Sequence, residues 1–243
     1  QSLSQDLISF SFEGRFLDMN GDIRVLDATA QNLLSDEAIA GVVLNVRDVT
    51  DRLKSQAAIR ESEEEFRVAR EIQQHLFPKQ APRADGLDIA GASSPAAATG
   101  GDYFDYLNTS DGQLVLAVAD VSGHGAGPAM LMAETRAYLR ILTRNRDHLG
   151  EILVRANNMV GEDVGKERFI TIELVKLDID SKTIVQCSAG HTPGYIIGKK
   201  GEIKHKMKRT GIALGVRPDA DYQVEGPSQL EKGDIILLQT DGL

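Results

Sequence analysis

The pattern of apolar and polar positions divides the chain into three segments, and the first, residues 1–51, reads as short strands. The dipeptide Asn20-Gly21 lies between apolar runs and is a strong signal for a β-hairpin. A further strand, AIAGVVLNVRD, ends at Asp48. We therefore expect a small β-sheet at the start of the chain.

The second segment, residues 51–77, contains no glycine or proline and is rich in arginine, glutamate, glutamine and alanine. Its larger apolar residues form a narrow helical stripe on a highly charged cylinder: Leu53, Ile59, Phe66, Ile72 and Leu76. A helix of this length spans about 40 Å. Pro78 and Pro82 are expected to end it.

The third segment mixes strands and helices. A buried strand, QLVLAVAD at 113–120, precedes a glycine-rich turn and a helix expected from about Pro128 to about Thr143. Strands follow near 168–178, 183–189, 194–198 and 234–240, with hairpin turns at Asp180-Ser181-Lys182 and Lys199-Lys200-Gly201. Because these strands follow one another through tight turns, the pattern predicts antiparallel sheet rather than βαβ alternation.

Composition narrows the functional classes. The 243 residues are 42% hydrophobic, enough for a sizeable core in one or two domains. With 27 basic and 36 acidic residues the net charge is -9, which argues against a nucleic-acid partner. The single cysteine, Cys187, permits no internal disulfide. No signal peptide or membrane-length apolar run is visible, so we expect a cytoplasmic location and no membrane contact within this chain.

Three aspartates lie where an apolar strand meets glycine: Asp102, Asp120 and Asp241. Strand ends hold side chains rigidly, and glycine lets a ligand or carbonyl approach closely. Three converging carboxylates repel one another and call for a cation. Oxygen ligands alone suit Mg²⁺ or Mn²⁺ rather than zinc. A single aspartate at a strand end is more often a turn or helix cap, so the interpretation depends on all three.

Five ordered motifs, GGDYFDY, ADVSGHGAGPAM, SAGHTPG, GIALGV and LLQTDGL, resemble the SpoIIE/RsbU-like branch of the metal-dependent protein phosphatases. The lead-in REIQQHLFP (70–78) is similar to the segment that precedes this domain in that branch. The resemblance covers about residues 66–243, and we place the domain itself at 78–243. It implies an α+β fold, an αββα sandwich of two antiparallel sheets flanked by helices. It also implies two Mn²⁺ or Mg²⁺ ions between the sheets.

The resemblance assigns roles to individual residues. Asp120 resembles the carboxylate that bridges both metals, with the backbone carbonyl of Val121 as a second ligand. Asp241 matches a ligand of one metal, and Asp102 matches an acidic residue that acts directly or through water. A water shared by the ions then attacks phosphorus in line. The pattern also expects one further aspartate on a strand after Asp241.

Two histidines and one more aspartate also lie within these motifs. His124, in SGHG, either protonates the leaving serine oxygen or only shapes its loop. His191, in AGHTP, is expected to be a structural residue of a buried loop rather than a ligand. Asp105 is expected either to contact and orient the metal ligands without binding the metal itself, or to be exposed to solvent.

The first two segments suggest regulation. Residues 10–52 resemble the second half of a PAS sensor domain, in which we expect no haem or flavin because the pocket-forming helices would lie upstream. The helix at 51–77 presents a narrow apolar stripe, and pairing with a second copy in a parallel coiled-coil homodimer would bury it. The alternative is a helix packed on its own phosphatase domain, which the irregular heptads permit.

Three functions follow from this interpretation. The first is hydrolysis of phosphoserine or phosphothreonine on a partner protein, which by resemblance is an anti-anti-sigma (STAS) regulator. The second is a sensor-driven scaffold, a pseudophosphatase that binds a phosphoprotein without turnover. The third is a general hydrolase of small phosphates.

Overall fold

The computed structural model describes residues 9–93, 100–145, 148–163 and 168–241. Residues 1–8 of the first segment and the end of the LLQTDGL motif lie outside these ranges. The chain forms two compact units, residues 1–65 and 66–243. Within the described ranges, no helix is long and apolar enough to cross a lipid bilayer.

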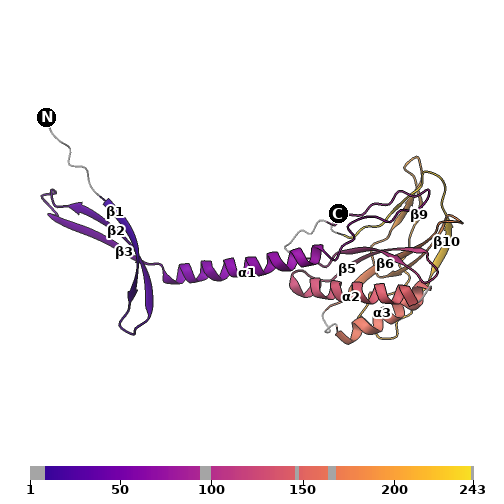
Figure 1. The fold of residues 1–243 in the computed structure, drawn as a ribbon, viewed down its shortest axis with the longest axis horizontal. Coiled ribbons are helices and arrows are strands. Elements are labelled where there is room, and N and C mark those ends of the chain that lie inside the picture. Colours follow the sequence, from indigo (N-terminus) through magenta and orange to yellow (C-terminus); the bar gives the residue numbers. More distant parts are fainter. Residues whose placement is uncertain (1–8, 94–99, 146–147, 164–167, 242–243) are drawn as a thin grey trace. The chain divides into compact units, whose positions relative to one another are not determined.

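The first unit contains a three-stranded antiparallel sheet in the order β1-β2-β3 (Figure 1). Its strands are β1 (Ser9–Leu17), β2 (Ile23–Leu33) and β3 (Gly41–Asp48). The predicted hairpin is confirmed, because β1 pairs with β2 across a turn in which Gly21 has a φ of 84°. Large apolar side chains of this sheet, such as Phe10 and Val42, are exposed. The sheet therefore lacks a cover over part of its apolar surface.

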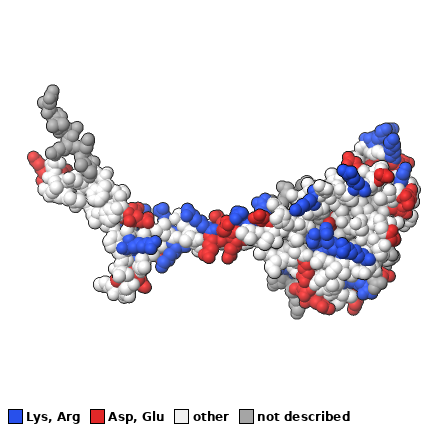
Figure 2. Space-filling view, in the orientation of Figure 1, with Lys and Arg blue, Asp and Glu red and all other residues white. Residues whose placement is uncertain are grey.

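Helix α1 (Thr50–Gln74) confirms the helix predicted at 51–77, although it ends three residues earlier. Its first turn is capped by Asp48, whose Oδ1 accepts a hydrogen bond from the Thr50 N–H at 2.9 Å. The helix carries charged side chains of both signs (Figure 2). Ile59, Phe66 and Ile72 of the predicted stripe are exposed.

The second unit is built around two antiparallel sheets. The larger has the order β10-β7-β6-β5-β4 and consists of β4 (Tyr103–Asn108), β5 (Leu114–Val121), β6 (Ile170–Asp178), β7 (Thr183–Ala189) and β10 (Glu225–Gln229). The smaller has the order β11-β8-β9 and consists of β8 (Tyr195–Ile197), β9 (Ile203–Lys206) and β11 (Ile235–Leu237). The predicted antiparallel pairing and α+β class are confirmed.

Alternating side chains of the larger sheet face two different cores. On one face, Ile172 and its neighbours pack with α2 (Ala126–Asn145) and α3 (Leu149–Asp163) (Figure 1). On the other face, Val175 and Leu177 pack with Ile196 of the smaller sheet. Among the described residues, helices cover only the outer face of the larger sheet. The expected sandwich is therefore observed with one helical layer rather than two.

Candidate metal centre

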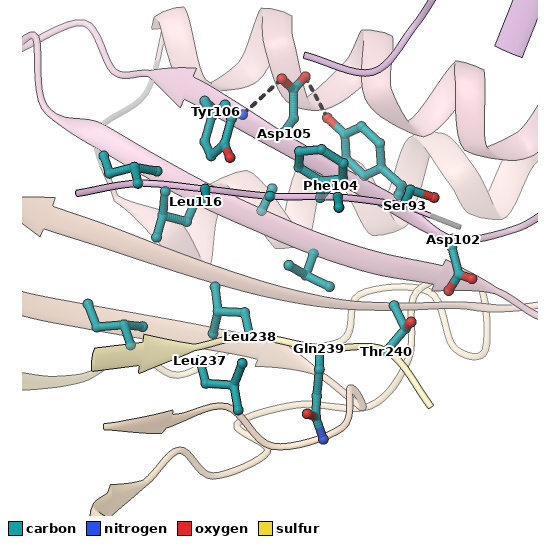
Figure 3. Close-up of a pocket in the computed structure, with 18 residues that line it drawn as sticks. Ser93, Asp102, Phe104, Asp105, Tyr106, Leu116, Leu237, Leu238, Gln239 and Thr240 are labelled. Atoms are coloured by element: carbon teal, nitrogen blue, oxygen red, sulfur yellow. Dashed lines mark hydrogen bonds between the residues drawn. The ribbon is translucent and has the colours of Figure 1, made fainter. Parts of the chain in front are cut away.

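The three predicted aspartates act on one another at the end of β5. The pKa of Asp120 is raised to about 6, first by burial and then by the negative charges of Asp102 and Asp241. Asp102 and Thr240, the residue before Asp241, line the same cavity (Figure 3). The three carboxylates, which come from distant parts of the sequence, are therefore near enough for the charges of Asp102 and Asp241 to raise the pKa of Asp120.

A glycine explains how Asp102 reaches this position. The Gly101 carbonyl accepts a hydrogen bond from the Val121 N–H at 3.2 Å. A Cβ atom on Gly101 would lie 2.3 Å from the Val121 carbonyl oxygen and 3.1 Å from Asp120 Oδ1. Only glycine lets the GGD segment lie flat against the Asp120–Val121 peptide. The Val121 side chain is buried in the core that faces the helices.

These groups suit a hard divalent cation, because all of them offer oxygen atoms. Burial and two carboxylates raise the pKa of Asp120, and a bound cation would reverse that repulsion. Within the described residues, however, no three histidine, cysteine or acidic side chains are grouped closely enough to hold an ion. The ligand set therefore fits Mg²⁺ or Mn²⁺ in kind, and it needs backbone carbonyls and water to complete a coordination shell.

The two histidines differ in their surroundings. His124 is exposed between Gly123 and Gly125, both with positive φ, and no hydrogen bond or ion pair joins it to a described residue. His191 is buried, with Nδ1 2.8 Å from the Thr171 hydroxyl. Burial lowers the pKa of His191 to about 4, so its imidazole is neutral. These surroundings agree with the predicted structural role of His191, which stays a prediction.

The expectation that Asp105 is solvated is wrong, whereas a role in supporting the metal ligands stays a prediction. Its buried carboxylate lies on the face of β4 that packs against α2, where Arg140 donates hydrogen bonds from Nε (2.6 Å) and Nη2 (2.8 Å). The Tyr103 hydroxyl donates a further bond at 2.9 Å (Figure 3). Asp105 therefore ties α2 to the strand that follows Asp102. Two arginines at positions 136 and 140, one helical turn apart, were the sequence feature that could have indicated a buried acidic partner.

A cavity of about 370 Å³ lies beside Asp102, between β4, β5 and the segment after β11 (Figure 3). Most of its lining is apolar and includes Ile89, Phe104 and Leu238. Asp102 and Asp105 are its charged lining residues, and Asp105 is already paired with Arg140. Among its described lining residues, the cavity therefore adds no unpaired carboxylate besides that of Asp102.

The two antiparallel sheets give this unit the fold of PP2C-type α+β domains. The solved PP2C domain of SiaA from Pseudomonas aeruginosa matches with a TM-score of 0.60 over 74% of this chain and 71% of that chain. The two sequences are 20% identical, so this likeness concerns the fold alone.

The family model for Stage II sporulation protein E (SpoIIE) matches residues 110–243, more than half of the chain, and the chain belongs to this family. "Phosphoserine phosphatase RsbU" of Bacillus subtilis is 31% identical over 75% of this chain and 54% of that protein. The RsbU and RsbW domains of Rv1364c from Mycobacterium tuberculosis match at 31% identity and a TM-score of 0.52, over 61% of this chain and 41% of that chain. The chain thus spans about half the length of these relatives.

Proposed function

We propose that this protein is a metal-dependent phosphatase that removes phosphate from phosphoserine or phosphothreonine of a partner protein in bacterial signalling. The observation that best supports the proposal is the close approach of the Gly101–Asp102 segment to Asp120 and Val121, with Asp241 near enough for its charge to raise the pKa of Asp120, within a SpoIIE-family domain. The family relatives RsbU and RsbP of Bacillus subtilis, both described as phosphoserine phosphatases, give it further support.

In this proposal the chain supplies carboxylate and carbonyl oxygens, held in place at strand ends, as metal ligands. Asp120 would be the ligand shared by two Mg²⁺ or Mn²⁺ ions, the Val121 carbonyl and Asp241 would each hold one of them, and Asp102 would act directly or through water. When bound, such ions supply an activated water and offset the charge on the phosphoryl oxygens. His124 lies in the glycine-flanked loop that follows Asp120 and Val121. It donates a proton to the leaving oxygen, or else it only shapes this loop.

A regulatory role for the first unit completes the proposal. The exposed apolar side chains of β1–β3 fit half of a PAS domain whose remaining helices would cover them. Exposed Ile59, Phe66 and Ile72 fit a parallel homodimer through residues 51–77. Sedimentation of the full-length protein beside a variant with serine at these three positions tests this part. A dimer that the substitutions dissociate supports it, and two monomeric species refute it.

One observation favours a second candidate, a phosphoprotein-binding scaffold without turnover. Among the described residues, no three potential metal-ligating side chains are close enough to hold an ion. A Mn²⁺ titration of the full-length protein separates the two candidates. Binding accompanied by hydrolysis of a phosphorylated STAS protein favours the enzyme, whereas phosphoprotein binding without Mn²⁺ binding or turnover favours the scaffold. Hydrolysis of nucleotides but not of phosphoprotein would indicate a general small-phosphate hydrolase.

A further inference from the structure

One side chain joins the last turn of α1 to the loop that carries Asp102. Gln73 Nε2 donates a hydrogen bond to the Gly100 carbonyl at 2.7 Å, and Gln73 Oε1 accepts one from the Gly100 N–H at 3.3 Å. The amide thus satisfies both backbone groups of one residue, as a neighbouring strand would. Gln73 is only 6% exposed, so removing its amide leaves backbone groups without their partner.

The residue held by Gln73 is close to the proposed ligands on two sides. Gly100 lies two positions before Asp102. The carbonyl of Gly101, which lies between them, accepts a hydrogen bond from the Val121 N–H. Gly101 also lies so close to the Val121 carbonyl that there is no room for a side chain. The path from α1 to the candidate metal centre therefore consists of one side chain and two residues of backbone.

The residues that directly follow α1 also contact the strand after Asp102. Leu76 and Phe77 pack against the main core, and the Phe77 ring stacks on the ring of Phe104 with centroids 5.5 Å apart. Asp102 thus lies between two points, Gly100 and Phe104, that are both held by residues 73–77. A shift of this turn relative to the sheet would move the backbone on both sides of Asp102.

We propose that Gln73 is a positioning residue for the metal centre. It holds Gly100 so that Asp102 and the Val121 carbonyl keep the arrangement that a divalent ion needs, and displacement of the last turn of α1 releases both. This inference rests on the proposed function, because it takes Asp102 and Val121 as ligands. Gln74, the next residue, has the same side chain in an exposed position and provides a matched control.

Calorimetric titration of the full-length protein with Mn²⁺ tests the inference directly. Gln73→Ala removes two hydrogen bonds and is expected to raise the Kd for Mn²⁺ about tenfold. Gln73→Glu, which keeps the acceptor but loses the donor, is expected to weaken binding as well. Gln74→Ala is expected to bind as the wild type does. An unchanged Mn²⁺ affinity in Gln73→Ala, with or without a lower melting temperature, would overturn the inference.

A readout without metal separates this inference from the proposed function. In metal-free protein, Gln73→Ala is expected to raise the hydrogen-exchange rate of the Val121 amide about tenfold, because its acceptor Gly101 is no longer held. The Leu139 amide in α2 should not change. If the wild type neither binds Mn²⁺ nor hydrolyses a phosphoprotein, the proposed function fails. Unchanged exchange at Val121 would refute the role of Gln73 in either case.

Discussion

Replacing one buried acid should make the second unit more stable at neutral and alkaline pH. Glu173 lies in β6, opposite Ser188 of β7, on the face that the smaller sheet covers, and it is 1% exposed. The pKa of Glu173 is raised from 4.5 to about 8, mainly by burial, while the nearby Ser188 hydroxyl opposes this rise and the charge of Glu225 adds to it. The carboxyl group is therefore neutral in the folded protein at pH 7.

The change in stability with pH follows from the difference between the folded and unfolded pKa values of Glu173. Because the folded pKa lies above the unfolded value of 4.5, the stability contributed by neutral Glu173 is complete below pH 4.5 and is lost as pH rises toward about 8. Each pH unit in this window costs about 1.4 kcal/mol. Between pH 5 and pH 8 the wild type therefore loses roughly 3 to 4 kcal/mol through this group. Glu173→Gln keeps the shape, does not titrate and avoids the loss.

Urea unfolding at pH 5, 6, 7 and 8 measures the effect. All five tyrosines lie between positions 103 and 222 and the chain has no tryptophan, so tyrosine fluorescence reports on the second unit alone. The difference in unfolding free energy between Glu173→Gln and wild type should grow in favour of the variant by about 1.4 kcal/mol per pH unit. Exposed Glu162→Gln is the control and should follow the wild type. A constant difference between variant and wild type across this range would show that Glu173 is not neutral in the folded protein.

Two further substitutions test the architecture of the site. Gly101→Ala places a Cβ atom 2.3 Å from the Val121 carbonyl, so it should abolish Mn²⁺ binding in a calorimetric titration; binding at wild-type affinity would contradict the close approach. Asp105→Asn leaves Arg140 without its charged partner, and because Arg140 is partly exposed we expect a loss of about 2 kcal/mol in urea unfolding. Wild-type stability would show that this ion pair does not hold α2 on β4.

Much of the fold could be predicted because its signals are local. Helix α1 follows from a long run without glycine or proline, and β5, β6 and β7 follow from apolar runs bounded by turn residues. Helix α3 was missed. It contains Gly150 and Gly161, which are poor helix formers, although Ile152, Ala156 and Val160 repeat at helical spacing toward the core. Tertiary packing stabilises this helix despite its composition.

The candidate site likewise combines features that the sequence indicates with others that depend on tertiary packing. The three aspartates could be predicted because each combines a strand end with a nearby glycine, which is visible in the sequence. The partners of Asp105 and Gly100 could not, because Arg140 is 35 positions away and Gln73 is 27 positions away. Such pairs form only when the sheet brings α1 and α2 beside β4 and the loop before it. Sequence patterns identify candidate ligands, and the structure is needed to identify the residues that hold them.

In the proposed function, the carboxylates around Asp120 hold divalent metal for phosphoester hydrolysis. The most direct test measures phosphate release from a phosphoserine protein by the full-length protein with Mn²⁺, with Mg²⁺ and with a chelator. Asp120→Asn and an exposed control, Asp88→Asn, are measured alongside. We expect turnover only with metal, a loss of roughly a hundredfold or more in Asp120→Asn, and no change in the control. Turnover in the presence of chelator, or full activity in Asp120→Asn, would contradict the proposed function.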